Sequence, residues 1–210
     1  AAVWDGIPGD PNNPKGTHIQ FDNGDGLLTV VEAGVIMHST TEDDERPNAK
    51  LALGIWRFSE KFDDLIDTDG SGNPIQRNNN QGLYLLGEYA ITREASDPAQ
   101  GLSVFARIGR ANDDINQFIQ YLGYGLVYTG PFATRNKDQL GLAVATAFNG
   151  DKYKQLTGAE DKETTIELTY HAAITPWLTI QPDVQYIINP GTDPAVKNTM
   201  VAGVRIGVIF

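Results

Sequence analysis

Few residues in this chain have the type and spacing that catalysis needs. The 210 residues include no cysteine, which excludes thiolate nucleophiles, disulfides and Cys-ligated metals. Three histidines lie in unrelated segments, without the spacing that brings two imidazoles to one zinc ion: His18, His38 and His171. Adjacent carboxylates such as Asp63/Asp64 and Asp113/Asp114 fall in polar linkers, where solvated charge is more typical than a general acid and base. The sequence predicts no enzyme, and a glycosidase fits it poorly.

One segment has the spacing of a calcium loop. In DTDGSGN, Asp67, Asp69 and Ser71 occupy alternate positions and Gly72 is sixth, as at the start of an EF-hand loop. The twelfth position is Asn78 rather than Glu, and no helix is expected on either side. An incomplete Ca²⁺ site and a plain Asp/Gly turn are therefore both open, and the turn is favoured. No other cofactor is expected.

The charge balance and the hydropathy exclude further classes of protein. Sixteen Lys and Arg against 27 Asp and Glu give a net charge of −11, which argues against nucleic acid as a partner. No run of about 18 apolar residues occurs, so no membrane helix is expected. A membrane-spanning β-strand needs only about 9–11 alternating residues, which is compatible with low average hydropathy.

Alternation of apolar and polar residues dominates the chain and predicts an all-β fold. We expect about nine strands, at 26–38, 49–60, 82–93, 101–111, 118–130, 138–149, 163–175, 177–189 and 199–210. Strands of soluble proteins average roughly 5–6 residues, whereas ten or more tilted residues cross a ~30 Å hydrocarbon layer. These lengths favour an antiparallel transmembrane β-barrel.

The clearest alternation lies in 178–189 and gives that strand one apolar and one polar face. Leu178, Ile180 and Val184 share the apolar face, opposite Gln181 and Asp183. A soluble β-sandwich also alternates in this way, with its apolar faces packed inward. Alternation alone therefore does not distinguish a membrane barrel from a soluble sandwich.

Three further features favour the barrel. Several polar faces carry small residues instead of Lys and Glu, as in Gly141, Ala143 and Ala145, so those faces are crowded or line something. Aromatic residues gather near strand ends, as in membrane barrels. Counting back from Phe210 at the periplasmic rim, the long linkers 61–81 and 150–162 both fall outside, where barrels have their long loops. The linker 39–48 falls on the periplasmic side and is longer than a typical turn there.

Several blocks of the sequence resemble the C-terminal half of the OprB-type carbohydrate-selective outer-membrane porins. They are GLSVFARIG (101–109), GLVYTGPF (125–132), IELTY (166–170), PWLTIQPDVQYIINPG (176–191) and VAGVRIGVIF (201–210), together with the opening AAVWDG. The resemblance runs along nearly the whole chain, and PWLTIQPDVQYI is its most specific block. Phe210 matches the terminal aromatic that outer-membrane assembly machinery reads in such proteins.

The resemblance implies a single-chain barrel of sixteen antiparallel strands, of which this chain supplies about nine. Residues 1–210 would form the C-terminal part of one barrel domain, and about seven N-terminal strands would lie in another or a missing segment. An odd strand number leaves the ends on opposite sides, which would place AAVWDGIPGDPNNPKG in an external loop. An unpartnered sheet edge in lipid would leave backbone groups unsatisfied.

The alternation also predicts which side chains would face the lumen. They are Glu32, Glu88, Phe105, Arg107, Glu167, His171, Gln181, Asp183, Gln185 and Arg205. Both signs of charge in a narrow lumen suit neutral polyols better than a filter of one sign. Arg and carboxylate groups grip vicinal hydroxyls, and Phe105 or Trp56 can stack on a pyranose. Alternatively, the charges only pair with one another and hold the barrel rigid.

We therefore expect a passive, substrate-selective diffusion channel for monosaccharide-type sugars in the outer membrane of a Gram-negative bacterium. Expected partners are sugars, the lipid bilayer and the N-terminal strands of the same barrel. External carboxylates could also bridge to lipopolysaccharide through divalent cations. The alternative is a soluble, secreted, lectin-like β-sandwich that binds carbohydrate.

Overall fold

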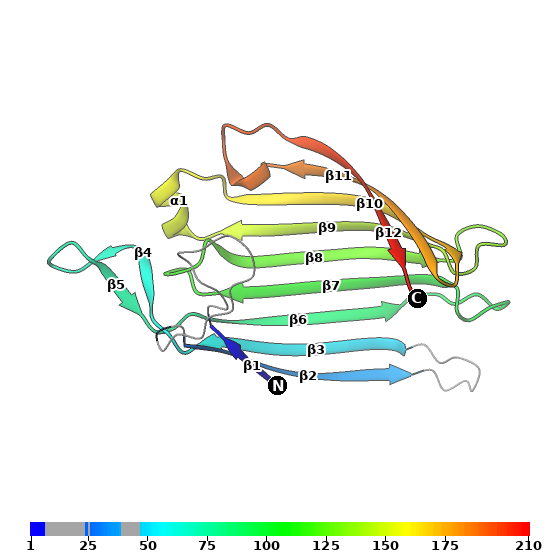
Figure 1. The fold of residues 1–210 in the computed structure, drawn as a ribbon, viewed down its shortest axis with the longest axis horizontal. Helices are drawn as coiled ribbons and strands as arrows, with labels where there is room; N and C mark the ends of the chain where they lie inside the picture. Colours follow the sequence, from blue (N-terminus) through cyan, green and yellow to red (C-terminus); the bar gives the residue numbers. More distant parts are fainter. Residues whose placement is uncertain (7–23, 25, 39–46) are drawn as a thin grey trace.

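The computed structural model describes residues 1–6, 24, 26–38 and 47–210. His18, the acidic run 42–45 and most of the 39–48 linker lie outside the described residues. Ten strands form one antiparallel sheet in the order β1-β2-β3-β6-β7-β8-β9-β10-β11-β12 (Figure 1). Their bounds are Ala2–Asp5 (β1), Leu27–His38 (β2), Pro47–Phe58 (β3), Gln81–Ala90 (β6), Gly101–Ala111 (β7), Phe118–Thr129 (β8), Gln139–Asn149 (β9), Lys162–Thr175 (β10), Leu178–Ile188 (β11) and Thr199–Val208 (β12).

The all-β, antiparallel fold and the nine long strands are confirmed. Each predicted strand is present, and β7 has the bounds that were predicted. The largest difference is at β6, which ends at Ala90 rather than at 93 because the chain there turns through a bridge between Glu94 and Asp97. Alternation is a local property of the chain, which is why it located these strands well.

The structure also contains elements that the sequence did not predict. Ala2–Asp5 pairs with Leu27–Val30, so the placement of the first residues in an external loop is wrong for this short strand. The 61–81 linker forms a separate hairpin of β4 (Phe62–Thr68) and β5 (Pro74–Arg77). The 150–162 linker contains helix α1 (Asp151–Thr157), and 190–198 begins with a short 3₁₀ turn, Pro190–Thr192. These elements are short and polar, so periodicity gives them almost no signal.

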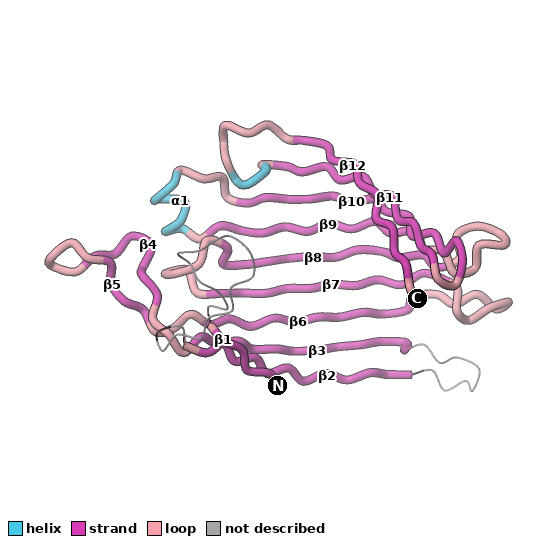
Figure 2. Tube along the Cα trace, in the orientation of Figure 1, coloured by secondary structure: helices cyan, strands magenta, loops and turns pink. Residues whose placement is uncertain are grey.

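The sheet is a single curved layer, in which β11 and β12 pass in front of the other strands (Figure 2). Its large apolar side chains are exposed: Leu168 by 53%, Val184 by 44% and Ile206 by 65%. Among the described residues only Ala172 is a buried apolar residue. A β-sandwich needs two apolar faces packed together. That arrangement is absent from the described part of the chain, so the sandwich alternative is wrong. None of the described helices is long and apolar enough to cross a bilayer.

A buried carboxylate fixes the turn that leads into β9. Asp138 is 1% exposed and accepts hydrogen bonds from Arg135 Nε at 2.6 Å, from the Ala173 backbone N–H at 3.0 Å and from the Tyr170 hydroxyl. Burial opposes its ionisation, but these bonds outweigh burial and lower the pKa of Asp138. The turn is thereby attached to β10, the strand beside it.

Candidate functional site

Strand register brings the predicted polar residues to one face of the sheet. One row of cross-strand neighbours runs through Lys50, Glu88, Phe105, Gly125, Ala143, Glu167 and Gln185. Arg107 lies two residues along β7, and Asp183 is opposite Thr169. Glu32, His171, Gln181 and Arg205 have the same parity. All ten residues predicted for the lumen thus share one side of the sheet, which we call the polar face.

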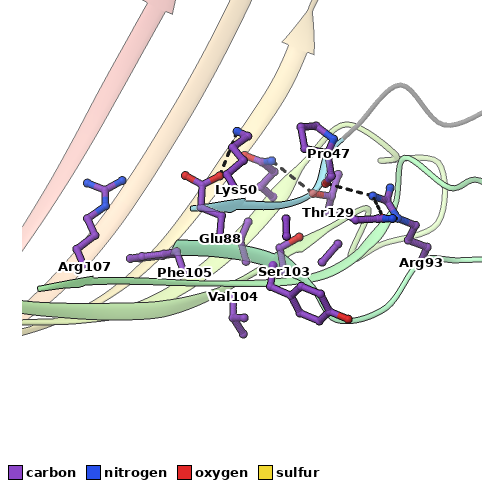
Figure 3. A pocket seen from close by; sticks show the side chains of 15 residues that line it. Pro47, Lys50, Glu88, Arg93, Ser103, Val104, Phe105, Arg107 and Thr129 are labelled. Carbon is purple, nitrogen blue, oxygen red and sulfur yellow. Dashed lines mark hydrogen bonds and ion pairs between the residues drawn. The ribbon is translucent and has the colours of Figure 1, made fainter. Parts of the chain in front are cut away.

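A hollow of about 440 Å³ lies on the polar face beside β3, β6 and β7. Figure 3 shows Lys50, Glu88 and Arg107 rising from one side of the wall, whereas Val104 points away on the other. Lys50 Nζ lies 3.1 Å from Glu88 Oε2, and both side chains are about half exposed. The Arg107 guanidinium carbon lies 5.6 Å from the centre of the Phe105 ring. The hollow therefore offers charged donors, a carboxylate and an aromatic ring together.

A second arginine, Arg93, lines the hollow and holds two segments of the chain together. Arg93 Nε and Nη2 donate to Asn48 Oδ1 at 3.1 and 2.8 Å, and Nη2 also donates to the Pro47 carbonyl at 3.2 Å. Its Nη1 donates to the Pro98 carbonyl at 3.2 Å. Arg93 thus ties the start of β3 to the turn after β6, and Arg107 is the arginine that faces the hollow.

On β10 and β11, one glutamine amide of the polar face binds two carboxylates. Gln185 Nε2 donates to Glu167 Oε2 at 3.1 Å and to Asp183 Oδ1 at 3.2 Å. By contrast, no ion pair within the described part of the chain involves Arg107 or Arg205. Carboxylates of the described wall therefore form no ion pair with these two guanidinium groups, and Arg107 rises from the polar face beside the hollow (Figure 3).

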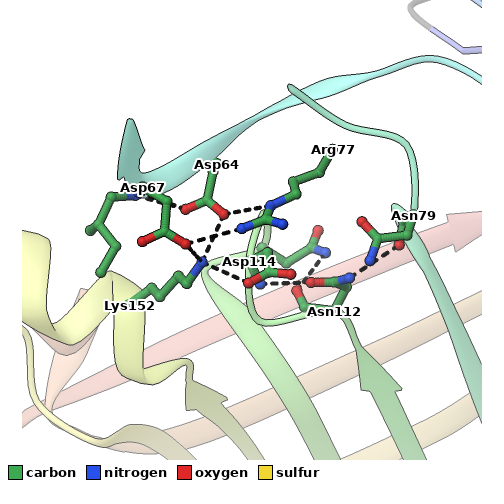
Figure 4. A network of polar contacts seen from close by, with 9 residues as sticks. Asp64, Asp67, Arg77, Asn79, Asn112, Asp114 and Lys152 are labelled. Carbon is green, nitrogen blue, oxygen red and sulfur yellow. Dashed lines mark hydrogen bonds and ion pairs between the residues drawn. The ribbon is translucent and has the colours of Figure 1, made fainter. Parts of the chain in front are cut away.

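A second polar cluster ties the β4–β5 hairpin to helix α1 and to the loop that contains Asp114 (Figure 4). The Lys152 ammonium, on α1, lies 2.7 Å from Asp64 Oδ2, 2.7 Å from Asp67 Oδ2 and 2.6 Å from Asp114 Oδ1. Arg77 Nε lies 2.8 Å from Asp64 Oδ2, and Arg77 Nη2 lies 3.0 Å from Asp67 Oδ2. We call these five residues the hairpin clamp. It joins three segments that are far apart in the sequence.

The prediction that Asp64 is solvated charge is wrong, since this residue is 4% exposed. Burial opposes its ionisation, but hydrogen bonds from Lys152, from the backbone N–H groups of Asp67 and Ile66 and from Arg77 outweigh burial and hold the pKa of Asp64 well below its usual range. Burial likewise lowers the pKa of Lys152, and its hydrogen bonds to the three carboxylates raise that pKa by more. No local sequence pattern predicts this cluster, because its charged residues come together only in the folded chain.

The candidate calcium loop lies next to the clamp. The Asp67 carboxylate is already bound to Arg77 and Lys152, at 3.0 and 2.7 Å. Asp69 Oδ1 accepts hydrogen bonds from the backbone N–H groups of Ser71 and Asn73 at 2.8 and 2.9 Å, which closes the turn. The carboxylates of Asp64, Asp67 and Asp114 lie close enough to share a cation, and the Lys152 ammonium binds all three. These contacts favour the plain turn of the two alternatives that the sequence left open.

We expect the clamp to hold between about pH 5 and pH 9. The lowered pKa of Asp64 means that its contribution is complete above the unfolded value of about 3.9 and is lost as pH falls through the folded value. The raised pKa of Lys152 means that its contribution is complete below about 10.4 and is lost as pH rises through the folded value. Hydrogen exchange at the backbone amides of Ile66 and Asp67, which donate to Asp64, measures the clamp. Loss of protection between pH 5 and pH 8, after correction for intrinsic exchange, would contradict this account.

Comparison with known proteins places this geometry among porins. The family model for "Carbohydrate-selective porin, OprB family" matches residues 1–210. Porin B of Pseudomonas aeruginosa is 32% identical over 191 residues, which cover 79% of this chain and 42% of that protein. The chain spans about half the length of the relatives that it matches.

Two solved structures of Pseudomonas putida OprB have the same fold. The high-pH structure has a TM-score of 0.77 and 28% identity, and the match covers 87% of this chain and 48% of that chain. The low-pH structure has a TM-score of 0.61 and 24% identity, and the match covers 90% of this chain and 48% of that chain. The ten-stranded sheet therefore corresponds to about half of a porin barrel.

Proposed function

Since this chain belongs to the OprB family of carbohydrate-selective porins, we propose that it forms the C-terminal part of a barrel through which monosaccharide-type sugars diffuse passively. Porins of this family are outer-membrane proteins of Gram-negative bacteria and are not enzymes, so both expectations from the sequence are confirmed. The preferred sugar and the residues that select it are part of the proposal.

The two unlike faces of the sheet carry the proposal. The apolar face exposes side chains such as Leu53, Leu142 and Ile206, at 53%, 47% and 65%. Such a band is costly in water and stable against lipid. The opposite face gathers the ten residues that were predicted for the lumen and would then border a water-filled space. A curved wall with lipid on one side and water on the other fits a channel.

The composition of the hollow suits a neutral sugar. A monosaccharide is smaller than the hollow of about 440 Å³, and its hydroxyls act as both donors and acceptors. Arg107 can grip a pair of hydroxyls through its guanidinium, and Glu88 can accept from another. Phe105 supplies a surface for the apolar C–H face of a pyranose. Both signs of charge close together also weaken any preference for small cations or anions.

The edges of the sheet support a companion segment. β1 pairs with only the first four residues of β2, and the far edge of β12 has no partner strand in the described chain. Unpaired backbone groups in lipid cost several kcal/mol each, so we propose that N-terminal strands of the same barrel pair with both edges. Phe210 would act as the assembly signal, and acidic loops would meet lipopolysaccharide through divalent cations.

Sugar block of the ion current tests the function directly. We expect the full-length porin that carries this chain to conduct ions in a planar bilayer, and glucose to reduce that conductance. Arg107→Ala should weaken glucose binding by about tenfold or more, because it removes a charge-assisted hydrogen bond of roughly 1.5–3 kcal/mol.

Arg110→Ala is the matched control, since Arg110 lies on the same strand with the opposite parity. It should leave glucose affinity unchanged. A porin that shows neither sugar block nor sugar flux in liposome swelling would refute the proposed function.

A further inference from the structure

In the nine long strands of the sheet, the apolar face carries three charged residues, and all three are basic. The acidic residues of these strands all lie on the polar face: Glu32, Glu88, Glu163, Glu167 and Asp183. The charged residues with the parity of the apolar face are Arg57, Arg110 and Lys162, which we call the basic rim. The chain as a whole has more acidic than basic residues, 27 against 16, so its composition does not explain an all-basic set.

The three cations lie at one end of the apolar face. Arg57 and Arg110 are each one residue from the end of their strands, β3 and β7, and Lys162 is the first residue of β10. This end of the sheet carries the β4–β5 hairpin and α1, at the left in Figure 1. Near the opposite end, the apolar face has tyrosines instead: Tyr89, Tyr128 and Tyr170. In the proposed barrel, the cations therefore lie toward the outside of the cell and the tyrosines toward the periplasm.

Strand register places two of the cations in one row. Arg110 is opposite Gln120. Gln120 is opposite Phe148, which is opposite Lys162. Lys162 Nζ lies 5.6 Å from the centre of the Phe148 ring. Three strand spacings of about 4.8 Å separate Arg110 from Lys162 by roughly 14 Å, and Arg57 lies two strands away on the other side of Arg110.

The two arginines line a hollow of about 900 Å³ on the apolar face. Its lining includes Thr29, Val31, Ile55, Arg57, Leu83 and Arg110, which all have the parity of that face. Val31, Ile55 and Leu83 are exposed by 46%, 57% and 49%. The hollow therefore combines two guanidinium groups with a patch of exposed aliphatic side chains.

The basic rim has no carboxylate bound to it. No ion pair within the described part of the chain involves Arg57, Arg110 or Lys162, and all three are exposed. Asp161 is next to Lys162 in the sequence, and its carboxylate lies 2.8 Å from the Lys154 ammonium. Long basic side chains on a lipid-facing surface extend their charged ends toward the head groups. An anionic head group at this level would meet three cations that no carboxylate neutralises.

We propose that the basic rim binds the phosphate groups of lipopolysaccharide in the outer leaflet. The inference rests on the proposed barrel, with its long linkers outside, and not on the sugar that the barrel prefers. Arg57 and Arg110 hold one phosphate through their guanidinium forks, and acyl chains lie on the aliphatic part of the hollow. Lys162 attracts a second phosphate farther along the rim. The cations gather at the outer end of the face, which matches a phosphorylated glycolipid of the outer leaflet rather than a phospholipid of the inner one.

The test titrates lipid A, the phosphorylated anchor of lipopolysaccharide, onto the full-length porin refolded in detergent, and native mass spectrometry counts the bound lipid. EDTA is present throughout, so acidic loops cannot contribute through divalent cations. Arg57→Gln, Arg110→Gln and Lys162→Gln should each weaken binding about fivefold, and the triple variant about a hundredfold, because each basic group near an anionic lipid adds a similar attraction. Phosphatidylglycerol should bind wild type at least about tenfold more weakly than lipid A.

Lys197→Gln is the matched control, because Lys197 is an exposed cation in the linker 190–198 and is not part of the rim. Its lipid A affinity should equal that of the wild type. Heat-modifiable migration on gels reports folding. Arg57→Lys or Arg110→Lys replaces a glutamine variant that does not fold, and the loss of the guanidinium fork should then weaken binding about twofold.

Equal lipid A affinity in the triple variant and in wild type overturns the proposal. An equal loss in Lys197→Gln, or equal binding of phosphatidylglycerol and lipid A, overturns it as well. Glucose block should persist in every rim variant, because these side chains face lipid. Absence of block and flux for glucose in the wild-type porin overturns the sugar channel instead, which is a separate result.

Discussion

Leu142→Arg should lower the free energy of unfolding of the complete barrel by about 2–4 kcal/mol, which is the cost of an arginine side chain near the middle of a bilayer. Leu142 lies on the apolar face, 47% exposed, and its cross-strand neighbours are Leu126 and Leu168. The charge would meet only apolar side chains and lipid there. Denaturant titration of the barrel folded into lipid vesicles measures the change.

The neighbouring position gives the matched control. Ala143 lies on the polar face between Gly125 and Glu167, so Ala143→Arg places the same side chain beside a carboxylate and water. Its unfolding free energy should stay within about 1 kcal/mol of wild type. The conductance should change instead, because the arginine occupies lumen space. Equal destabilisation by the two substitutions would mean that the faces do not separate lipid from water.

Replacing Lys152 with methionine should release the β4–β5 hairpin. The variant removes the ammonium that holds three carboxylates, and it leaves buried Asp64 with Arg77 as its remaining ion-pair partner. Breaking a buried ion pair from one side costs about 3 kcal/mol. Backbone amide exchange at Ile66 and Asp67 should therefore accelerate by about a hundredfold. Hydrogen exchange with mass spectrometry at pH 7 measures this.

Lys154→Met is the control on the same helix. Lys154 pairs with Asp151 and Asp161, whose side chains are 89% and 81% exposed. Surface pairs of this kind contribute little, so the exchange in β4 should not change. Unchanged exchange in Lys152→Met would show that the hairpin is held by something other than the clamp.

The strands were predictable because their signal is local. The alternation in 177–189 needs no knowledge of neighbours, and β11 runs from Leu178 to Ile188. The same alternation assigned Glu167 and Asp183 to one face before any pairing was known, and the register places Gln185 opposite Glu167 on that face.

The hairpin clamp could not be predicted, because it depends on distant pairs. Asp64 and Lys152 are 88 positions apart in the chain, and the sequence shows each only as a charge in a linker. β1 was missed for a related reason, since four residues are too few for periodicity and their partner lies about 25 residues on. Which charges of the polar face pair with one another also depends on register and rotamer.

The small residues of the polar face signalled crowding without showing its cause. Gly54 and Gly125 are small because Tyr84 and Phe105 lie over them, and the sequence separates these partners by 30 and 20 positions. Once the strands are aligned, the same residues explain why a polar wall carries so few long side chains there.

In the proposed channel, the width at the level of Tyr84 would be set by a residue that no solute touches, because this ring rests on Gly54. A methyl group added at Gly54 would displace the Tyr84 ring, because the three atoms nearest to its place all belong to that side chain. Size exclusion and chemical preference can therefore be retuned separately, one from the supporting strand and the other from the strand that bears the ring.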